Sequence, residues 1–166
     1  LQSYVLKKEL WLLNKKNNAA VEFSNDGLVI RTAFDKKNES LYLTSGSATT
    51  GSMGESASQY NISSFTKMAF NINLEYSLDC NASLFIIEFD DKNKISSKSI
   101  ELASGENQFS FNFDIRTKFL KLSYRLKSRK ESNSAFLVLK KMVLEGELSH
   151  SNSIVKQNCI LTSSTS

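Results

Sequence analysis

Apolar and polar residues alternate through most of the chain between residues 19 and 148, and this alternation predicts β-strands. The clearest segment is KMAFNINLEYSL, residues 67–78, in which every second residue is apolar. Those apolar residues are Met68, Phe70, Ile72, Leu74, Tyr76 and Leu78. Because successive side chains of a strand point to opposite faces, the segment predicts one buried face and one polar face.

The same period of two recurs on both sides of this segment. Residues 20–34 predict two short strands joined by a tight turn at Asn25, Asp26 and Gly27, where glycine supplies a positive φ. Further strands are expected at SLYLTS, at QFSFNFD with its three phenylalanines inward, and at FLKLSYRLK. In AFLVLKKMVLEGEL the apolar parity changes at Lys140 and Lys141, which predicts a β-bulge.

The segment SLFIIEFDD, residues 83–91, is apolar at both parities and predicts a strand in the interior of a sheet. The acidic pair Asp90 and Asp91 follows it. Adjacent carboxylates on a strand point to opposite faces and do not converge on one atom, whereas aspartate commonly forms turns. We therefore interpret the pair as a turn and not as catalytic or metal-binding chemistry.

About nine strands without a convincing intervening helix predict an all-β protein, an antiparallel β-sandwich. Three domain assignments follow from this. Residues 1–18 form a lead-in segment, with a spacing that favours a short N-terminal helix; residues 19–148 form the sandwich domain; and residues 149–166 form a polar tail or linker. The Gly/Ser/Thr-rich stretch 45–58 is expected to be a long loop.

Composition excludes several functional classes. The 166 residues carry a net charge of +4, but the basic residues are scattered, which gives no nucleic-acid footprint. No apolar run is long enough to span a membrane. Cys80, Cys159 and His150 have no partners at ligand spacing, so we predict no metal site, no cofactor and no histidine-based catalysis. The absence of proline and the abundance of Asn, Lys and Ile suggest an AT-rich bacterial genome.

The order of these features resembles the jelly-roll carbohydrate-binding modules of bacterial carbohydrate-active and surface-glycan proteins. The segments that carry the resemblance are VEFSNDGLVI, YNISSFTKMAFNINLEY, SLFIIEFDDKNKI and LKLSYRLKSRKESNSAFLVLKKMVLEGEL. The resemblance implies a jelly roll, an oligo- or polysaccharide as ligand, and no catalytic residues. It also implies attachment to a larger protein, in the cytoplasm or at the cell surface according to that protein; the start at Leu1 agrees with such a domain.

The predicted ligand-binding residues are the outward polar residues of strands expected to be neighbours, together with two aromatic residues off the core parity. Amides, carboxylates and a guanidinium suit sugar hydroxyls, which need both donors and acceptors. The residues are Asn71, Asn73, Glu75, Glu88, Lys121, Arg125, Tyr42 and Tyr60. Ser123 shares this outward parity, and the same pattern also fits a merely solvated sheet face.

Three functions therefore remain open. The first is a non-catalytic glycan-binding accessory module of a larger glycan-processing or glycosylating protein. The second is a structural or assembly domain that makes protein contacts only, which predicts a flat apolar patch. The third is a small glycoside hydrolase, which requires Glu75 and Glu88 to converge in one cleft.

Overall fold

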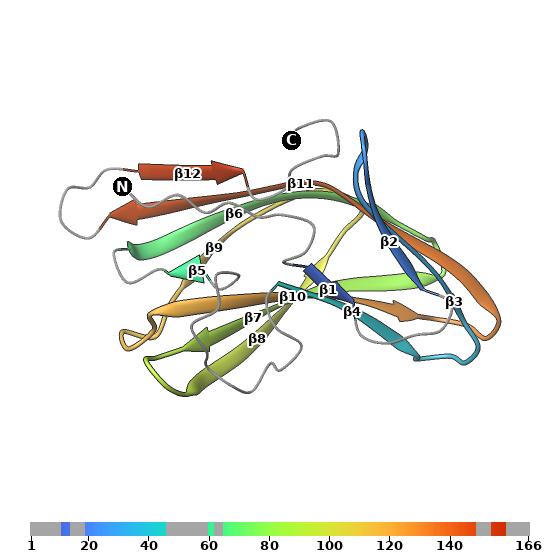
Figure 1. Cartoon of the computed structure of the whole chain (residues 1–166), viewed down its shortest axis with the longest axis horizontal. Helices are drawn as coiled ribbons and strands as arrows, with labels where there is room; N and C mark the ends of the chain where they lie inside the picture. Colours follow the sequence, from blue (N-terminus) through green and yellow to red (C-terminus); the bar gives the residue numbers. More distant parts are fainter. Residues whose placement is uncertain (1–10, 14–18, 46–59, 62–64, 149–153, 159–166) are drawn as a thin grey trace.

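The computed structural model describes residues 11–13, 19–45, 60–61, 65–148 and 154–158, and every element in this part of the chain is a β-strand (Figure 1). The strands are β1 (Trp11–Leu13), β2 (Ala20–Ser24), β3 (Gly27–Phe34), β4 (Ser40–Ser45), β5 (Tyr60–Asn61), β6 (Phe65–Tyr76), β7 (Cys80–Phe89), β8 (Lys94–Leu102), β9 (Gly105–Asn112), β10 (Phe119–Ser128), β11 (Asn133–Leu148) and β12 (Ile154–Asn158). The predicted all-β fold is confirmed.

The strands form two antiparallel sheets that pack face to face (Figure 1). Sheet A has the order β1-β4-β10-β7-β8, with β5 also paired to β10. Sheet B has the order β2-β3-β11-β6-β9, with β12 also paired to β11. Neighbours in each sheet are mostly distant in sequence, so the chain crosses between the layers repeatedly, as in a jelly roll. The strand β7 lies between β10 and β8, as its two apolar faces predicted.

Gly27 closes the β2–β3 hairpin with a φ of +118°. Its backbone also lies against β11, because a Cβ at this position would stand 2.2 Å from the carbonyl oxygen of Leu139. Glycine is therefore required twice, once by the backbone conformation and once by the close approach of the neighbouring strand.

The predicted bulge in β11 is present. The pairing of β11 with β6 shifts register between Leu139 and Lys141. Leu137 and Leu139 before the shift and Met142 and Leu144 after it are all at most 1% exposed. The extra residue thus keeps both halves of a sixteen-residue strand on the same core face.

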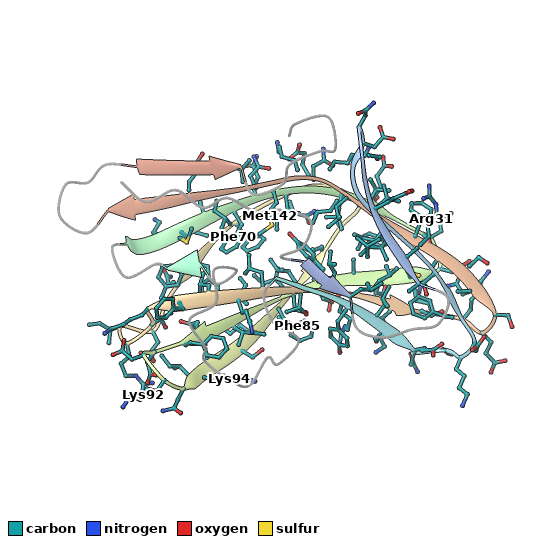
Figure 2. The ribbon with its side chains drawn as sticks, viewed as in Figure 1. Arg31, Phe70, Phe85, Lys92, Lys94 and Met142 are labelled. Atoms are coloured by element: carbon teal, nitrogen blue, oxygen red, sulfur yellow. The ribbon has the colours of Figure 1, made fainter. Side chains whose placement is uncertain are left out.

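The core lies between the sheets and includes the alternate residues that the sequence pattern selected on β3, β6 and β10. Phe111 is buried, and Phe109 and Phe113 are half-buried against it. Polar atoms also connect the layers, since the Tyr124 hydroxyl of sheet A lies 3.1 Å from the Met142 sulfur of sheet B. Figure 2 shows Phe70 and Met142 in this interior.

Three expectations differ from the structure: one concerns the end of β6, and the other two concern the N-terminal and C-terminal segments of the chain. Leu78, expected inward, is 93% exposed because β6 ends at Tyr76 and Leu78 lies in the turn before β7. Residues 11–13, expected in a helix or lead-in, form a strand on the edge of β4. Within the predicted polar tail, residues 154–158 pair with β11, so backbone pairing and not apolar periodicity forms this strand.

The rest of the predicted lead-in segment (residues 1–10 and 14–18), the predicted loop from residue 46 to residue 58, His150 and Cys159 lie outside the described residues. No helix capable of crossing a membrane occurs among the residues described.

Candidate functional site

The structure divides the predicted ligand-binding residues between the two sheets. Asn71, Asn73 and Glu75 lie on β6 of sheet B, whereas Lys121 and Arg125 lie on β10 of sheet A. The expectation that these strands are neighbours is wrong. Alternation within one strand assigns residues to a face, but it does not identify the sheet, so the predicted polar surface is two separate surfaces.

The sheet B residues largely bind one another and their neighbours. The Asn73 amide donates to Glu106 at 3.2 Å, and Glu75 forms an ion pair with Lys140 at 2.8 Å. Asn71 lines a shallow depression of about 350 Å³ with Gln108, and the Asn71 side-chain oxygen is buried without a hydrogen-bond partner. The nearby rings of Phe70 and Phe109 stack on each other with centroids 4.9 Å apart.

Glu88 was expected on the outward surface, and this is wrong. The residue is 0% exposed and shares the inward parity of Leu84 and Ile86. Its Oε1 accepts hydrogen bonds from the Asp114 amide at 2.8 Å and from the Thr117 hydroxyl at 2.7 Å.

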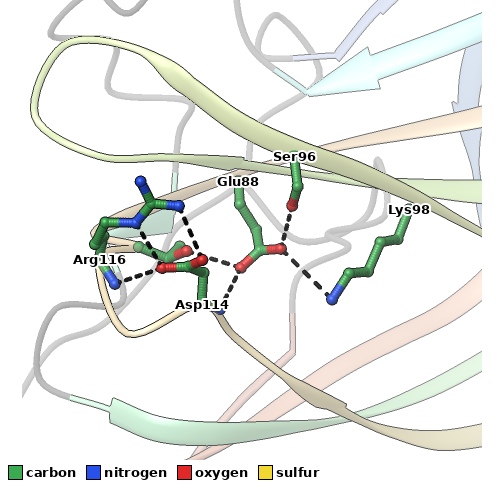
Figure 3. Close-up of polar contacts among 6 residues, drawn as sticks. Glu88, Ser96, Lys98, Asp114 and Arg116 are labelled. Carbon is green, nitrogen blue, oxygen red and sulfur yellow. Dashed lines mark hydrogen bonds and ion pairs between the residues drawn. The ribbon is translucent and has the colours of Figure 1, made fainter.

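The other Glu88 oxygen, Oε2, accepts from the Ser96 hydroxyl and lies 4.0 Å from the Lys98 ammonium (Figure 3). Asp114 and Thr117 belong to the connection by which the chain passes from β9 in sheet B to β10 in sheet A. The buried charge is stabilised by these donors, so Glu88 fastens that connection and is not available to a ligand.

The outer face of sheet A holds a different grouping, which we call the aromatic–arginine cluster. It consists of Tyr42, Ser83, Phe85, Glu101 and Arg125. The backbone register brings the five residues together, because β4, β10, β7 and β8 are consecutive in the sheet. Figure 2 shows Phe85 on the side of sheet A that faces away from sheet B.

The aromatic rings and the guanidinium of this cluster are in contact. The rings of Tyr42 and Phe85 have centroids 6.1 Å apart at an angle of 51°. The Arg125 guanidinium carbon lies 5.0 Å from the Phe85 centroid, within cation–π range. Tyr42, Phe85 and Arg125 are each half-buried, so each retains some exposed surface.

Hydrogen bonds orient the polar members of the cluster. An Arg125 terminal nitrogen donates to the Ser83 hydroxyl at 3.4 Å, and that hydroxyl donates to Glu101 at 3.1 Å. The Arg125 Nε is buried, and no described residue forms a hydrogen bond with it. The cluster therefore offers two half-buried rings, a carboxylate and the terminal nitrogens of a half-buried guanidinium.

Lys121 and Ser123 have the outward parity that was predicted, yet they are only 1% and 4% exposed. The Ser123 hydroxyl lies 2.7 Å from that of Thr44 on β4. Desolvation by burial lowers the pKa of Lys121 from its ordinary value. These two residues lie beneath the accessible surface of this face and do not form its exposed part. Of Tyr60, the structure describes only the backbone, which pairs with Leu120.

The acidic pair at the end of β7 forms a turn, as the sequence indicated. One Asp90 carboxylate oxygen accepts from the backbone amides of Lys92 at 2.8 Å and Asn93 at 2.7 Å. These two bonds lower the pKa of Asp90 from its ordinary value. Asp91 instead forms an ion pair with Lys118 at 2.9 Å.

Asp114, whose backbone amide binds the buried Glu88, has a side-chain pKa that is lowered more strongly than that of Asp90. Its carboxylate binds the Arg116 guanidinium at 2.9 and 3.0 Å (Figure 3). The Arg116 side chain, and then the Arg116 backbone amide, lower the pKa of Asp114 to about 2. Because this ion pair joins two residues of one loop, it organises the β9–β10 connection and does not create a catalytic acid.

Sequence reasoning missed Ser83, Phe85 and Glu101. The strand β7 is apolar at both parities, so periodicity did not indicate which face points outward. A usable signal lay in the partner strand, since Ser123 was correctly placed outward and Phe85 is directly opposite it. Cross-strand pairs share a face, so correct pairing would have identified Phe85 as an outward aromatic.

Among the described residues, no group of three or more His, Cys, Asp or Glu side chains is arranged to hold a metal ion. Cys80, the described cysteine, is buried and unpaired, and desolvation by burial raises the pKa of its thiol. It contributes to the core and not to the candidate site.

No family model matches the sequence, and no curated protein matches it. Solved structures do share the fold. A family 61 carbohydrate-binding module in complex with β-1,4-galactotriose superposes with a TM-score of 0.55 at 10% identity, over 89% of this chain and 100% of that one. The N-terminal cellulose-binding domain of β-1,4-glucanase C from Cellulomonas fimi gives a TM-score of 0.51 at 11% identity, over 87% and 93%.

A domain of a larger enzyme shares the fold as well. The enzymatically active part of tailspike protein 4 from bacteriophage CBA120 matches with a TM-score of 0.51 at 9% identity, over 90% of this chain but 19% of that one. At such identities the likeness concerns the fold alone. The chain thus has the jelly-roll sandwich fold of carbohydrate-binding modules, as the sequence resemblance implied.

Proposed function

We propose that this chain is a non-catalytic glycan-binding module and that the outer face of sheet A binds the glycan. The observation that carries the proposal is the aromatic–arginine cluster. Half-buried Tyr42 and Phe85 present ring surface on which the C–H faces of a sugar can pack, and polar groups stand directly beside them. Ligand sites typically combine such apolar surface with a few oriented donors and acceptors.

The polar groups of the cluster can form hydrogen bonds with the hydroxyl groups of a sugar. Hydroxyl groups both donate and accept, and Glu101 accepts while the terminal nitrogens of Arg125 donate. The Arg125–Ser83–Glu101 chain of hydrogen bonds holds these groups before any ligand arrives. Such preorganisation lowers the entropy that binding must overcome.

The depression on sheet B is a weaker candidate for the glycan site. Its lining includes Asn71 and Gln108 together with Phe70 and Phe109, but these two rings stack on each other on the core parity of their strands, and Phe70 is 1% exposed. It therefore offers amides and one half-buried ring, that of Phe109, whereas the cluster on sheet A offers two half-buried rings beside a guanidinium and a carboxylate.

The alternative functions receive less support. Glu75 lies outward on sheet B and Glu88 is buried at the end of sheet A, so this pair does not form the two-carboxylate cleft of a hydrolase. An assembly patch would need contiguous exposed apolar side chains. The large exposed apolar residues of the described part are Leu78 and Ile115, which lie beyond opposite ends of the paired strands β6 and β9, and Phe136 on β11, which is 40% exposed. They are few and do not cover one face.

The proposal also includes the role of this chain within a larger protein. Several neighbours in the structural comparison are modules, and one matching domain makes up 19% of a larger enzyme. We infer that this chain serves as an accessory domain of a bacterial glycan-processing or glycosylating protein, and that it supplies binding and not catalysis.

A glycan array screened with the purified chain tests the proposal. We expect binding to at least one oligo- or polysaccharide, and we expect Phe85→Ala to weaken it about tenfold or more, which corresponds to about 1.4 kcal/mol. Gln108→Ala, an exposed residue of the sheet B depression, serves as the matched control and should leave affinity unchanged.

Two outcomes would count against it. An array without any binding would favour the assembly function. Loss of binding in Gln108→Ala with full binding in Phe85→Ala would move the glycan site to sheet B.

A further inference from the structure

The outer face of sheet A carries an excess of positive charge. Its central strand, β10, places Lys121, Arg125 and Lys127 at alternate outward positions. The adjoining outward positions of β4 and β7 are uncharged, and those of β8 that lie opposite β7 add the single carboxylate of Glu101. Counted over the described residues of these four strands, the outward positions carry more cations than carboxylates, and such a surface attracts acidic ligands and disfavours cationic ones.

Arg125 forms no ion pair within the described part of the chain. Among the described residues no carboxylate forms an ion pair with it, since the nearby Glu101 accepts instead from Ser83. Its Nε is buried and has no hydrogen-bond partner among the residues that the structure describes. Arginines on sheet B and in the β9–β10 connection contrast with it, because Arg31 pairs with Glu22 and Arg116 with Asp114.

A half-buried guanidinium without a counter-ion carries an uncompensated desolvation cost. The guanidinium fork matches a carboxylate or another planar or tetrahedral oxyanion, with two parallel hydrogen bonds. Contact with the Phe85 ring fixes the plane of the Arg125 group, so an oxyanion that reaches its free edge would meet a preset geometry.

We infer that the ligand is an acidic glycan, whose carboxylate or sulfate group pairs with Arg125 while a sugar ring packs on Phe85 and Tyr42. This inference rests on the proposed glycan-binding function and adds its substrate class. Lys127, half-buried on the same strand, stands two residues further along and would meet a second acidic group of the same polymer. Buried Lys121 contributes charge from beneath the surface.

The test compares polygalacturonate, its carboxyl-reduced form and a sulfated galactan by calorimetry at low and high salt. We expect one of the two acidic polymers to bind about tenfold or more tightly than the reduced polymer, with weaker binding at high salt. Whether the carboxylated or the sulfated polymer binds more tightly identifies the preferred anion.

Substitutions test whether Arg125 causes the preference for acidic polymers. Arg125→Gln should abolish the preference for acidic polymers and retain the weaker binding to the reduced one, while Arg125→Lys should keep part of the preference. Arg31→Gln, on the outer face of sheet B, is the matched control and should change nothing. If Arg125→Gln does not fold, Lys127→Gln replaces it and should reduce the preference severalfold.

Equal binding of the acidic and reduced polymers would overturn the inference and leave the glycan-binding function intact. An equal effect of Arg31→Gln would also overturn it. Binding to none of the three polymers would contradict the inference, and a negative array besides would contradict the proposed function. Binding to single-stranded DNA as tight as to the acidic polymers would replace the glycan with a nucleic acid.

Discussion

Glu88 is a charged residue in a position that an apolar residue would normally occupy. Both of its oxygens accept hydrogen bonds, from Ser96 on β8 and from Asp114 and Thr117 in the β9–β10 connection. The charge is retained inside because these donors replace water. One side chain therefore holds an edge of sheet A and a crossover between the sheets in register.

Changing Glu88→Gln keeps the shape of the side chain and removes its charge. Hydrogen bonds to a charged acceptor are stronger than neutral ones, so we expect the free energy of unfolding to fall by about 1–3 kcal/mol. Denaturant titration of the variant measures this. Glu106→Gln, an exposed carboxylate on β9, should change stability by no more than about 0.5 kcal/mol. Equal losses in the two variants would show that Glu88 does not fasten the connection.

The sequence could not reveal this residue from its strand alone. Its neighbours Ile87 and Phe89 are also buried, so β7 has no polar side for comparison. The partners that make burial of the charge tolerable come from residues 8 to 29 positions away along the chain. Only the tertiary arrangement brings these donors to Glu88.

At the scale of elements, the β2–β3 hairpin and the bulged β11 depend on one close contact. Gly27 and Gly105 both have positive φ values, +118° and +104°. Only Gly27 lies against another strand, where an added Cβ would meet the Leu139 oxygen, while a Cβ at Gly105 would meet nothing within 4 Å. A comparison of substitutions at the two glycines therefore separates the cost of backbone strain from the cost of a steric clash.

Gly27→Ala should lower the free energy of unfolding by at least about 2 kcal/mol, because the new methyl group forces the hairpin away from β11. Gly105→Ala should cost about 1 kcal/mol, since it adds only the conformational penalty. Thermal and denaturant unfolding of both variants provide the comparison. A Gly105→Ala loss as large as that of Gly27→Ala would mean that the contact with Leu139 is not important.

Local patterns predicted these elements well. The turn at Asn25–Gly27, the Asp90 turn and the bulge at Lys140 all follow from backbone preferences or from a change of parity within a few residues. The short edge strands β1 and β12 were not predicted as strands. Each is at most five residues long and owes its conformation to pairing with β4 or β11, which short windows of sequence do not record.

At the scale of the whole molecule, the fold class was predictable and the site only in part. Alternation identifies which residues are inward, and a sandwich follows from many such strands. It does not establish which strands pair, so Asn71, Asn73 and Glu75 were grouped with Arg125 although they belong to the other sheet. Tyr42 and Arg125 were expected in the site and are direct cross-strand partners, whereas Phe85 required the observed register.

The two outer faces thus differ in chemistry. Within the described residues, sheet A presents aromatic rings, an arginine without an ion pair and more cations than carboxylates. Sheet B presents amides and paired ions around the depression at Asn71. The central claim is that the first of these faces binds the glycan.

An NMR titration of the labelled chain with a glycan selected on the array tests this claim most directly. We expect the largest shifts at the backbone amides of Tyr42, Ser83, Phe85 and Arg125, with the amides of the sheet B depression unchanged. Large shifts at Asn71, Gln108 and Ser110, with the four residues of sheet A unaffected, would contradict it.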